Sequence, residues 1–255
     1  MVKNFHIFGK GISFSVSPTI HNAGFQHYVL PFTYTIHDSD SFDKAALLII
    51  SDSFGGVSVT MPHKLQVHKF CDEQTETVQL IGAVTVKGND SELKSTGDNT
   101  YWSGLYNIVT AHSTKTQHQP TTGLVIGAAG ASRAALYALH KAGVKRIYLV
   151  NRTLATAEKV KDDFKSVFEI KVVPGLQDLP KKPEVVISTV PVDTTTEDQF
   201  SSLFSDRGLC VDMSYKPRQT PLLIAAQQNQ GWDTITGVEI LLAQAFDQFL
   251  LWTGL

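Results

Sequence analysis

The stretch Leu124-Val125-Ile126-Gly127-Ala128-Ala129-Gly130-Ala131-Ser132-Arg133 decides the fold of this 255-residue chain. Its three leading apolar residues predict a short buried strand, and the residues from Ser132 onward predict a helix that ends at Gly143. The glycines between them permit a tight turn and close approach of backbone to a ligand, while a helix N-terminus carries partial positive charge. A strand, a glycine turn and a helix in this order are the setting of a dinucleotide-binding loop, although many such turns only connect elements.

The segment Asn151-Arg152-Thr153 supports a dinucleotide site. It follows a second predicted strand, residues 146–150, at about the place where such folds carry the acid that binds the ribose of NAD. An Arg stands there with no acid beside it, and a guanidinium group pairs well with the 2′-phosphate of NADP. The alternative is that Arg152 is an ordinary solvated charge on a loop. Because it follows a predicted strand of a dinucleotide-binding pattern, we favour a role in binding NADP.

Strand-like and helix-like segments alternate along the chain, which predicts an α/β fold with mostly parallel strands. The expected strands are residues 5–8, 32–36, 56–60, 80–86, 92–95, 124–126, 146–150, 185–187 and 209–211. The expected helices are residues 17–28, 42–51, 132–142, 155–168, 222–229 and 238–252, the last apolar on most faces. The polar stretch 112–122, which contains Pro120, is predicted to be a loop between two lobes.

Composition narrows the class of protein. Hydrophobic residues make up 42% and charged residues 18%, and the formal net charge of −2 gives no reason to expect nucleic-acid or membrane binding. Cys71 and Cys210 lie far apart and form no metal-ligand pair, so we expect no metal. Because no stretch resembles a signal peptide or a membrane span, we expect a cytoplasmic protein.

Three separated motifs point to one known family. They are Ser15-Val16-Ser17-Pro18 with His21-Asn22, Val59-Thr60-Met61-Pro62-His63-Lys64, and Gly97-Asp98-Asn99-Thr100-Tyr101. They resemble the Ser-x-Ser-Pro-x-x-His-Asn, Val-Thr-x-Pro-x-Lys and Gly-x-Asn-Thr-Asp motifs of shikimate dehydrogenases. The glycine turn at 127–131 is similar to the Gly-Ala-Gly-Gly-Ala loop of the same family. The resemblance covers essentially the whole chain.

The resemblance implies a two-lobed α/β protein that moves hydride between shikimate and its 3-keto form with NADP. It implies a substrate-binding lobe over residues 1–108, completed by a returning C-terminal helix at 238–255, and a Rossmann NADP-binding lobe over 109–237. The residues that it implies at the acid are Ser15, Ser17, Thr60, Lys64, Thr85, Tyr101, Tyr215 and Gln244, with Lys64 as the catalytic group in proton transfer. The residues that it implies at the cofactor are Gly127, Ala128, Ala129, Gly130, Ala131, Asn151, Arg152, Thr153, Thr189, Val190, Met213 and Gly237.

The end of the chain extends the resemblance. The tail Gln248-Phe249-Leu250-Leu251-Trp252-Thr253-Gly254 is especially similar to the shikimate dehydrogenase domain of the fungal multifunctional aromatic-pathway protein. The fungal quinate repressor is related to that protein. The resemblance therefore implies a ligand of the shikimate or quinate class and the possibility of a longer multidomain protein.

Three positions depart from the family pattern. Ala129 replaces the second loop glycine, Thr85 replaces an Asn that contacts substrate hydroxyls, and Tyr101 replaces an Asp that binds substrate and pairs with the Lys. A Tyr side chain is much larger than Asp and has no carboxylate, and losing a positioned acid–base partner costs about 100- to 10,000-fold in rate. Two functions remain open: an NADP-linked dehydrogenase with impaired or altered activity, and a non-catalytic sensor that binds a shikimate- or quinate-like acid.

Overall fold

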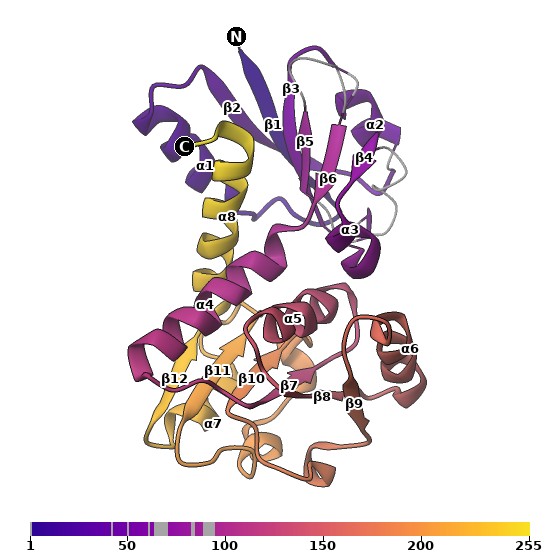
Figure 1. Ribbon diagram of the computed structural model, residues 1–255. Helices are drawn as coiled ribbons and strands as arrows, with labels where there is room; N and C mark the ends of the chain where they lie inside the picture. Colours follow the sequence, from indigo (N-terminus) through magenta and orange to yellow (C-terminus); the bar gives the residue numbers. More distant parts are fainter. Residues whose placement is uncertain are drawn as a thin grey trace. The chain divides into compact units, whose positions relative to one another are not determined.

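The computed structural model describes residues 2–41, 43–49, 51–60, 62–63, 71–82, 85–88 and 95–255. The chain divides into two compact units, Met1–Thr100 with Gln244–Leu255, and Tyr101–Ala243 (Figure 1). Each unit contains one six-stranded sheet and its own helices, which confirms the predicted α/β class.

The first unit is built on a mixed sheet with the strand order β2-β1-β3-β5-β6-β4. Its elements are β1 (Lys3–Gly9), α1 (Ser17–His27), β2 (Phe32–Asp38), α2 (Asp43–Ile49), β3 (Phe54–Val59), β4 (Glu73–Gln74), α3 (Glu76–Ile81), β5 (Thr85–Gly88) and β6 (Ser95–Asp98), joined by the later turns of α8 (Gly237–Thr253). Strands β2, β1 and β3 run parallel, whereas β5 pairs antiparallel with both β3 and β6. The predicted helix at 17–28 is confirmed with Pro18 in its first turn, where the missing N–H costs nothing.

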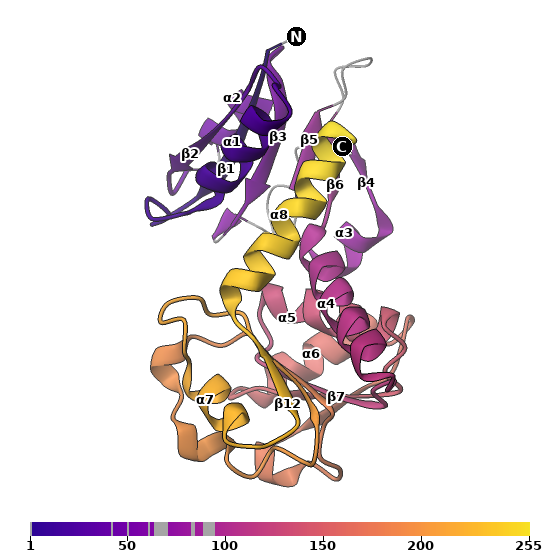
Figure 2. The same cartoon turned by 90° about the vertical axis from the view of Figure 1, so that its left-hand side faces the viewer.

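An aromatic cluster ties the C-terminal helix to the first sheet. Phe5, Phe25, Tyr34 and Trp252 are almost fully buried, and the ring centroids of Phe5 and Trp252 lie 5.0 Å apart. The indole N–H of Trp252 donates a 3.2 Å hydrogen bond to the carbonyl oxygen of Val86 in β5, beside which α8 lies in Figure 2. A Cβ at Gly56 would overlap the Trp252 indole, so this position requires the smallest residue. The expected return of the last helix to the first lobe is confirmed.

The second unit is a fully parallel sheet with the strand order β12-β11-β10-β7-β8-β9. Its elements are α4 (Thr100–Thr116), β7 (Thr122–Ile126), α5 (Gly130–Lys141), β8 (Arg146–Val150), α6 (Leu154–Phe164), β9 (Ile170–Val173), β10 (Val185–Ser188), β11 (Gly208–Asp212), α7 (Pro221–Gln227) and β12 (Trp232–Ile235), with short 3₁₀ helices η3 (Leu176–Asp178), η4 (Val192–Thr194) and η5 (Glu197–Phe200). The strand order reverses between β7 and β10, and in open parallel sheets ligands bind outside the strand ends at such a point.

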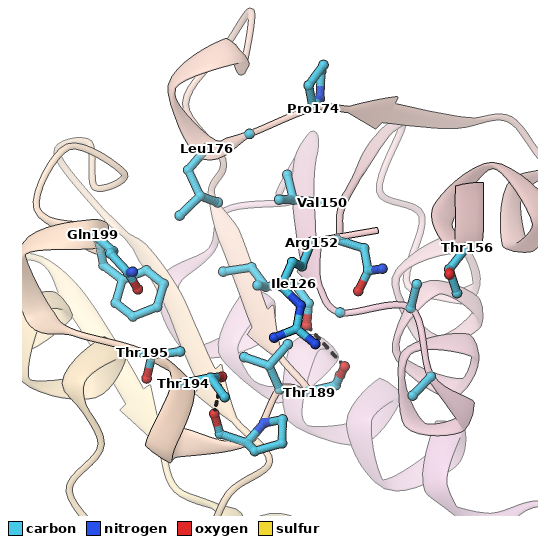
Figure 3. A pocket seen from close by; sticks show the side chains of 18 of the residues that line it. Ile126, Val150, Arg152, Thr156, Pro174, Leu176, Thr189, Thr194, Thr195 and Gln199 are labelled. Carbon is cyan, nitrogen blue, oxygen red and sulfur yellow. Dashed lines mark hydrogen bonds between the residues drawn. The ribbon is translucent and has the colours of Figure 1, made fainter. Parts of the chain in front are cut away.

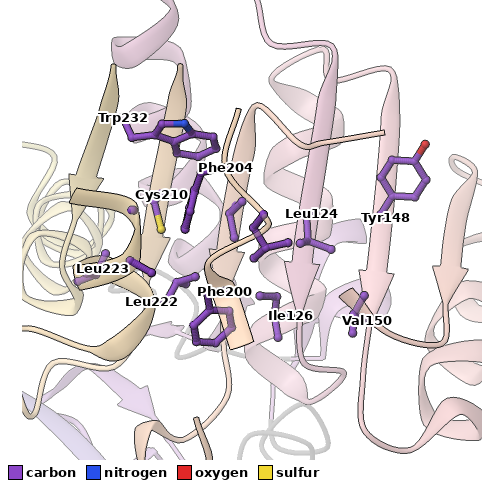
Figure 4. Packing of buried hydrophobic residues seen from close by; sticks show 14 of the residues in the cluster. Leu124, Ile126, Tyr148, Val150, Phe200, Phe204, Cys210, Leu222, Leu223 and Trp232 are labelled. Carbon is purple, nitrogen blue, oxygen red and sulfur yellow. The ribbon is translucent and has the colours of Figure 1, made fainter. Parts of the chain in front are cut away.

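The strands of the second unit are apolar because helices and loops cover both faces of a parallel sheet. All residues of β7, β10 and β11 are buried. On one face Leu124 and Ile126 of β7 pack in a cluster with Phe200 and with Leu222 and Leu223 of α7 (Figure 4). This core holds the ends of β7 and β10 in place.

The predicted loop at 112–122 is wrong over its first part, because α4 continues to Thr116. The hydroxyls of Ser113, Thr114 and Thr116 donate to the carbonyl oxygens four residues earlier in the helix, and His112 bonds Asp233. The polar composition of this stretch therefore accompanies a helix whose hydroxyls bond its own backbone.

Other differences have local causes. The strand predicted at 80–86 is two elements, because α3 continues through Ile81 and is closed by Gly82 in the left-handed conformation. The helix predicted at 155–168 ends at Phe164. The prediction missed the short elements β4, β9, β12 and α3, and also the 17-residue helix α4. Of the strand predicted at 92–95, only Ser95 lies within the described residues, where it begins β6.

Two buried imidazoles and one anchored carboxylate link stability to pH. Burial and the neighbouring His37 lower the pKa of His6 to about 4, and burial lowers the pKa of His21 to about 4. Partial burial raises the pKa of Glu184, but hydrogen bonds from Thr121 and His118 outweigh it and lower the pKa to about 2. Below the ordinary pKa of each group the unfolded chain binds more protons than the folded chain, so stability falls with acid.

We predict that the free energy of unfolding decreases as pH falls from 6.5 to 4 because His6 and His21 protonate only on unfolding. Each imidazole contributes a slope of up to about 1.4 kcal/mol per pH unit. The substitution His6→Gln should remove one such contribution, measured by urea unfolding at several pH values. An unchanged slope in His6→Gln would contradict the prediction. Glu184 should add a further loss between about pH 4.5 and 2.

Candidate active site

A pocket of about 690 Å³ lies at the carboxyl ends of β7, β8 and β10 in the second unit (Figure 3). Its walls come from the loops after these strands and from η3, η4 and η5. The lining residues are Ile126, Gly127, Ala128, Ala129, Val150, Asn151, Arg152, Thr156, Pro174, Gly175, Leu176, Gln177, Thr189, Val190, Pro191, Thr194, Thr195, Gln199 and Phe200. The predicted turn at 127–129 and the predicted Arg152 thus lie in one pocket.

Gly127 stands at the point where three strand ends meet. Its N–H donates to the carbonyl oxygen of Val150 at 2.8 Å, while Thr189 donates from both its N–H and its hydroxyl to the carbonyl oxygen of Ile126. The φ of Gly127 is +106°, and a Cβ there would overlap Thr189 Oγ1 and lie 3.0 Å from Val190 Cγ1. Only glycine satisfies both the backbone conformation and the close approach.

Ala129 and Gly130 begin helix α5. Ala129 has extended backbone, with φ −94° and ψ −171°, so its replacement of a family glycine causes no backbone strain. A Cβ added at Gly130 would meet no described atom within 4 Å. Among the described residues no side chain caps the N-terminus of α5, and an uncapped helix N-terminus is a favourable place for an anion.

Arg152 supplies the positive charge of the pocket. Figure 3 shows its guanidinium group reaching in among the lining residues, and no Asp or Glu belongs to that lining. Within the described chain Arg152 makes no hydrogen bond or ion pair, whereas Asn151 Nδ2 donates to the carbonyl oxygen of Thr153 at 2.9 Å and shapes the turn. An unpaired Arg at the end of β8 is a suitable partner for a phosphate group.

Met213, directly after β11, lies close to Gly237, the first residue of α8. A Cβ at Gly237 would lie 2.7 Å from the carbonyl oxygens of both Met213 and Ser214, so the start of α8 contacts this backbone directly. Asp212 shapes the turn, because its carboxylate accepts from the Ser214 N–H at 2.9 Å and from the Thr220 hydroxyl at 2.7 Å. Burial raises the pKa of Asp212, and these hydrogen bonds oppose that rise.

Tyr101 and Tyr215 are neighbours in the second unit. Tyr101 lies in the first turn of α4 and Tyr215 follows β11, yet the two phenols interact. Burial and the nearby Tyr101 phenol raise the pKa of Tyr215. Two positions that resemble acid-binding positions of the family thus carry phenol side chains, one of which affects the ionisation of the other.

Ser15 and Ser17 lie together at the start of α1. The Ser15 hydroxyl donates to Ser17 Oγ at 3.2 Å and accepts from the Ser17 N–H at 3.3 Å. Ser17 is buried and is the first helical residue, so it is not a cap in this structure. Thr60 follows β3, and its N–H donates to the carbonyl oxygen of Phe8. In the first unit, the serine pair thus lies at the start of α1, and Thr60 lies directly after β3.

Thr85 is buried inside the first unit with its hydroxyl engaged. Thr85 Oγ1 lies 3.0 Å from Thr100 Oγ1 and accepts a 3.1 Å hydrogen bond from Gln248 Nε2. Gln244 is buried one turn earlier on α8. Sequence reasoning missed Gln248, although its four-residue spacing from Gln244 places both on one face of the helix.

Lys64, the predicted catalytic group, lies outside the described residues, so its role stays a prediction. His21 is fully buried and stacks on Tyr34 at a centroid distance of 4.6 Å. Sequence reasoning missed several lining residues that carry no motif: Thr156, residues 174–177, Thr194, Thr195, Gln199 and Phe200. Among the described residues no group of three metal-ligating side chains occurs, and no helix is long and apolar enough to cross a membrane.

Two family models match this chain. The shikimate dehydrogenase substrate binding domain matches residues 7–86, and shikimate / quinate 5-dehydrogenase matches residues 110–228. The chain belongs to the shikimate dehydrogenase family. The family resemblance expected from the motifs is confirmed.

Curated relatives and solved structures agree with this assignment. The pentafunctional AROM polypeptides of Malassezia globosa and Schizosaccharomyces pombe are 41% and 36% identical over 99% of this chain, which spans only 17% of their length. The structure of dehydroquinate dehydratase and shikimate dehydrogenase from S. pombe AroM is 36% identical with a TM-score of 0.87, covering 100% of this chain and 51% of that one. Shikimate 5-dehydrogenase from Thermus thermophilus, in complex with NADP(H) and shikimate, is 27% identical with a TM-score of 0.81, covering 99% and 94%.

We predict that Gly127→Ala lowers the free energy of unfolding by about 1–3 kcal/mol, because the new methyl group meets Thr189 in a strained backbone conformation. The matched substitution Gly130→Ala should leave it unchanged or raise it by up to about 1 kcal/mol, since its methyl group meets open space. Urea unfolding measures both. Equal effects of the two substitutions would contradict the geometry.

Proposed function

We propose that this chain is a shikimate dehydrogenase-type domain that binds NADP and a shikimate- or quinate-class acid, with impaired or altered turnover. The observation that carries the cofactor part is the pocket at the ends of β7, β8 and β10, which combines a glycine turn, a helix N-terminus and Arg152. Solved relatives named as complexes with NADP(H) and with NADP+ support the same cofactor class.

The residues present fit NADP. Open space at Gly130 and the uncapped start of α5 suit a pyrophosphate, and Arg152 with no acid in the lining suits a 2′-phosphate. Ala129 adds one methyl group beside this space and leaves the backbone conformation intact, so we expect weaker binding and not its loss. When bound, NADP supplies or accepts the hydride.

The acid is assigned to the first unit. Two adjacent hydroxyls, Ser15 and Ser17, stand at the start of α1, where a carboxylate is favoured by hydroxyl donors and the helix N-terminus. We assign proton transfer to Lys64 by family resemblance, and a binding role to Gln244. Thr60 is assigned to the same acid.

Tyr101 is the reason to expect impaired or altered turnover. It stands where the family Asp would hold both the substrate hydroxyls and the catalytic Lys, and it neighbours the Tyr215 phenol. A phenol offers no charge partner to Lys64, so the Lys would be less well positioned. Loss of such a partner costs about 100- to 10,000-fold in rate.

A second candidate function is a non-catalytic sensor that binds the acid. Thr85 favours it, because its hydroxyl is buried at 2% exposure and already bonded to Gln248 and close to Thr100. The protein would then still bind the acid but would lack the residues that hydrogen-bond its reacting hydroxyl groups. The relatives also suggest that the domain works within a longer multienzyme polypeptide, since it spans about a sixth of their length.

We predict that Tyr101→Asp raises kcat/KM for NADP-dependent oxidation of shikimate by about 100- to 10,000-fold. The physical reason is that a carboxylate restores the charge partner of Lys64. Tyr101→Asn is the matched control, because Asn has the size of Asp without its charge and should not restore the rate. Full family-level activity of the unmodified chain would refute the impairment, and absence of binding of both acids in calorimetry would refute the proposed ligand class.

We predict that Arg152→Ala weakens NADP binding by about tenfold or more while leaving NAD binding nearly unchanged, because only NADP carries the 2′-phosphate. Calorimetric titration with each dinucleotide measures the effect. Arg207→Ala is the control, because it removes the same charge before the amino end of β11, away from the pocket. Equal weakening of NADP and NAD in Arg152→Ala would contradict the assignment.

A further inference from the structure

Gln248 stands at the centre of a buried polar network in the first unit. It is 4% exposed, on the part of α8 that lies beside β5 in Figure 2. Its amide joins residues of α1, β3 and β5, none of which is near it in the sequence. A buried amide of this kind is favourable only when both its ends find partners.

The carbonyl end of Gln248 is an acceptor for two donors. Ser58 Oγ donates to Gln248 Oε1 at 3.1 Å, and His21 Nε2 lies 3.2 Å from the same oxygen. The Tyr34 hydroxyl in turn donates to Ser58 Oγ at 2.9 Å. A carbonyl oxygen has two lone pairs, so this end of the amide is fully used.

The amino end of Gln248 donates to Thr85 Oγ1 at 3.1 Å. Thr85 Oγ1 is also 3.0 Å from Thr100 Oγ1, so the two threonine hydroxyls share the next hydrogen bond of the chain. Both threonines are buried. The network therefore extends from His21, through Gln248 and Thr85, to Thr100.

The direction of the amide is determined by its partners. If it were flipped, its N–H groups would face Ser58 Oγ and His21 Nε2, and Ser58 already accepts from Tyr34. His21 would then need its proton on Nδ1, a buried atom with no hydrogen-bond partner in the described structure. An unsatisfied buried N–H is costly, so the orientation with Nε2 facing Thr85 is favoured.

The far end of the network is the start of α4. Thr100 is the first residue of that helix, and the next residue along the chain is Tyr101. A hydrogen bond that restrains the Thr100 side chain also restrains the backbone that leads into Tyr101. Thr85 thus has a structural role in this chain, in place of contacting a hydroxyl group of a ligand.

We propose that Gln248 is a positioning residue, which through Thr85 and Thr100 holds the first turn of α4 and thereby the side chain of Tyr101. Its effect on acid binding rests on the proposed function, whereas its effect on the first turn of α4 does not. Neither residue 85 nor residue 101 then acts alone, because one restrains the backbone that carries the other.

The substitution that tests this role is Gln248→Glu. A glutamate can still accept from Ser58 and His21, but it has no N–H for Thr85. The Thr85 hydroxyl must then donate to the carboxylate, so it can no longer donate to Thr100. Ser58→Ala is the matched control, because it removes a hydrogen bond of the same amide without touching the Thr85 side. Thr85→Val breaks the same link without adding a charge, and it replaces Gln248→Glu if that variant does not fold.

The first measurement is hydrogen exchange of the amides of residues 99–102, with thermal unfolding of each variant. We expect exchange about tenfold faster in Gln248→Glu and in Thr85→Val, and unchanged exchange in Ser58→Ala even where its melting temperature falls equally. Equal acceleration in all variants, or none in Gln248→Glu and Thr85→Val, would overturn the positioning role.

The second measurement is the affinity for shikimate and quinate by calorimetry. We expect the dissociation constant of the bound acid to rise about tenfold in Gln248→Glu and to stay unchanged in Ser58→Ala. If the unmodified chain binds neither acid, the proposed function fails while the exchange result still decides the positioning role. If acid binds equally to all variants, the link from Gln248 to the ligand is overturned.

Discussion

The close approach of three strand ends at Gly127 is the constraint on which the candidate cofactor pocket depends. The end of β7 is bonded to Val150 on one side and to Thr189 on the other, and no side chain fits between them. This contact brings the loops after β8 and β10 to the same place, so that Arg152 and Thr189 line one cavity. Helix α5 can then begin directly at the pocket, with its uncapped N-terminus facing the space that a phosphate would take.

The first unit depends on a different constraint, which is the return of the C-terminal helix. Trp252 fills the aromatic cluster around Phe5, and Gln248 satisfies buried polar groups one turn earlier on the same helix. The apolar contacts supply the main stabilisation by removing surface from water, and the polar contacts select one arrangement, because a misplaced amide would leave buried donors without partners. The segment that closes the fold also supplies Gln244 to the proposed acid site.

The three departures from the family pattern have different physical meanings. Ala129 needs no special backbone conformation, so under the proposed function it alters only the space around a phosphate. Thr85 belongs to a network that leads to Thr100, so its change from the family Asn is part of the packing of the first unit. Under the proposed function, Tyr101 is the residue that would alter chemistry, because it puts a phenol where the family has a carboxylate. The proposed function thus assigns the three changes to binding, to structure and to catalysis in turn.

The sequence by itself determined the α/β class and the glycine turn, because a strand, the turn and a helix are encoded within ten consecutive residues. It also determined the family, because three separated motifs carry the resemblance. It also identified Arg152, whose place at a strand end follows from the same local pattern. Only the tertiary structure decided that residues 100–116 form a helix, that Thr85 bonds Gln248, and that the Tyr101 phenol affects the ionisation of Tyr215. The last two features depend on segments that are far apart in the chain, and the helix contains hydroxyl side chains that bond their own backbone. Neither cause produces a periodic sequence pattern from which the feature could be predicted.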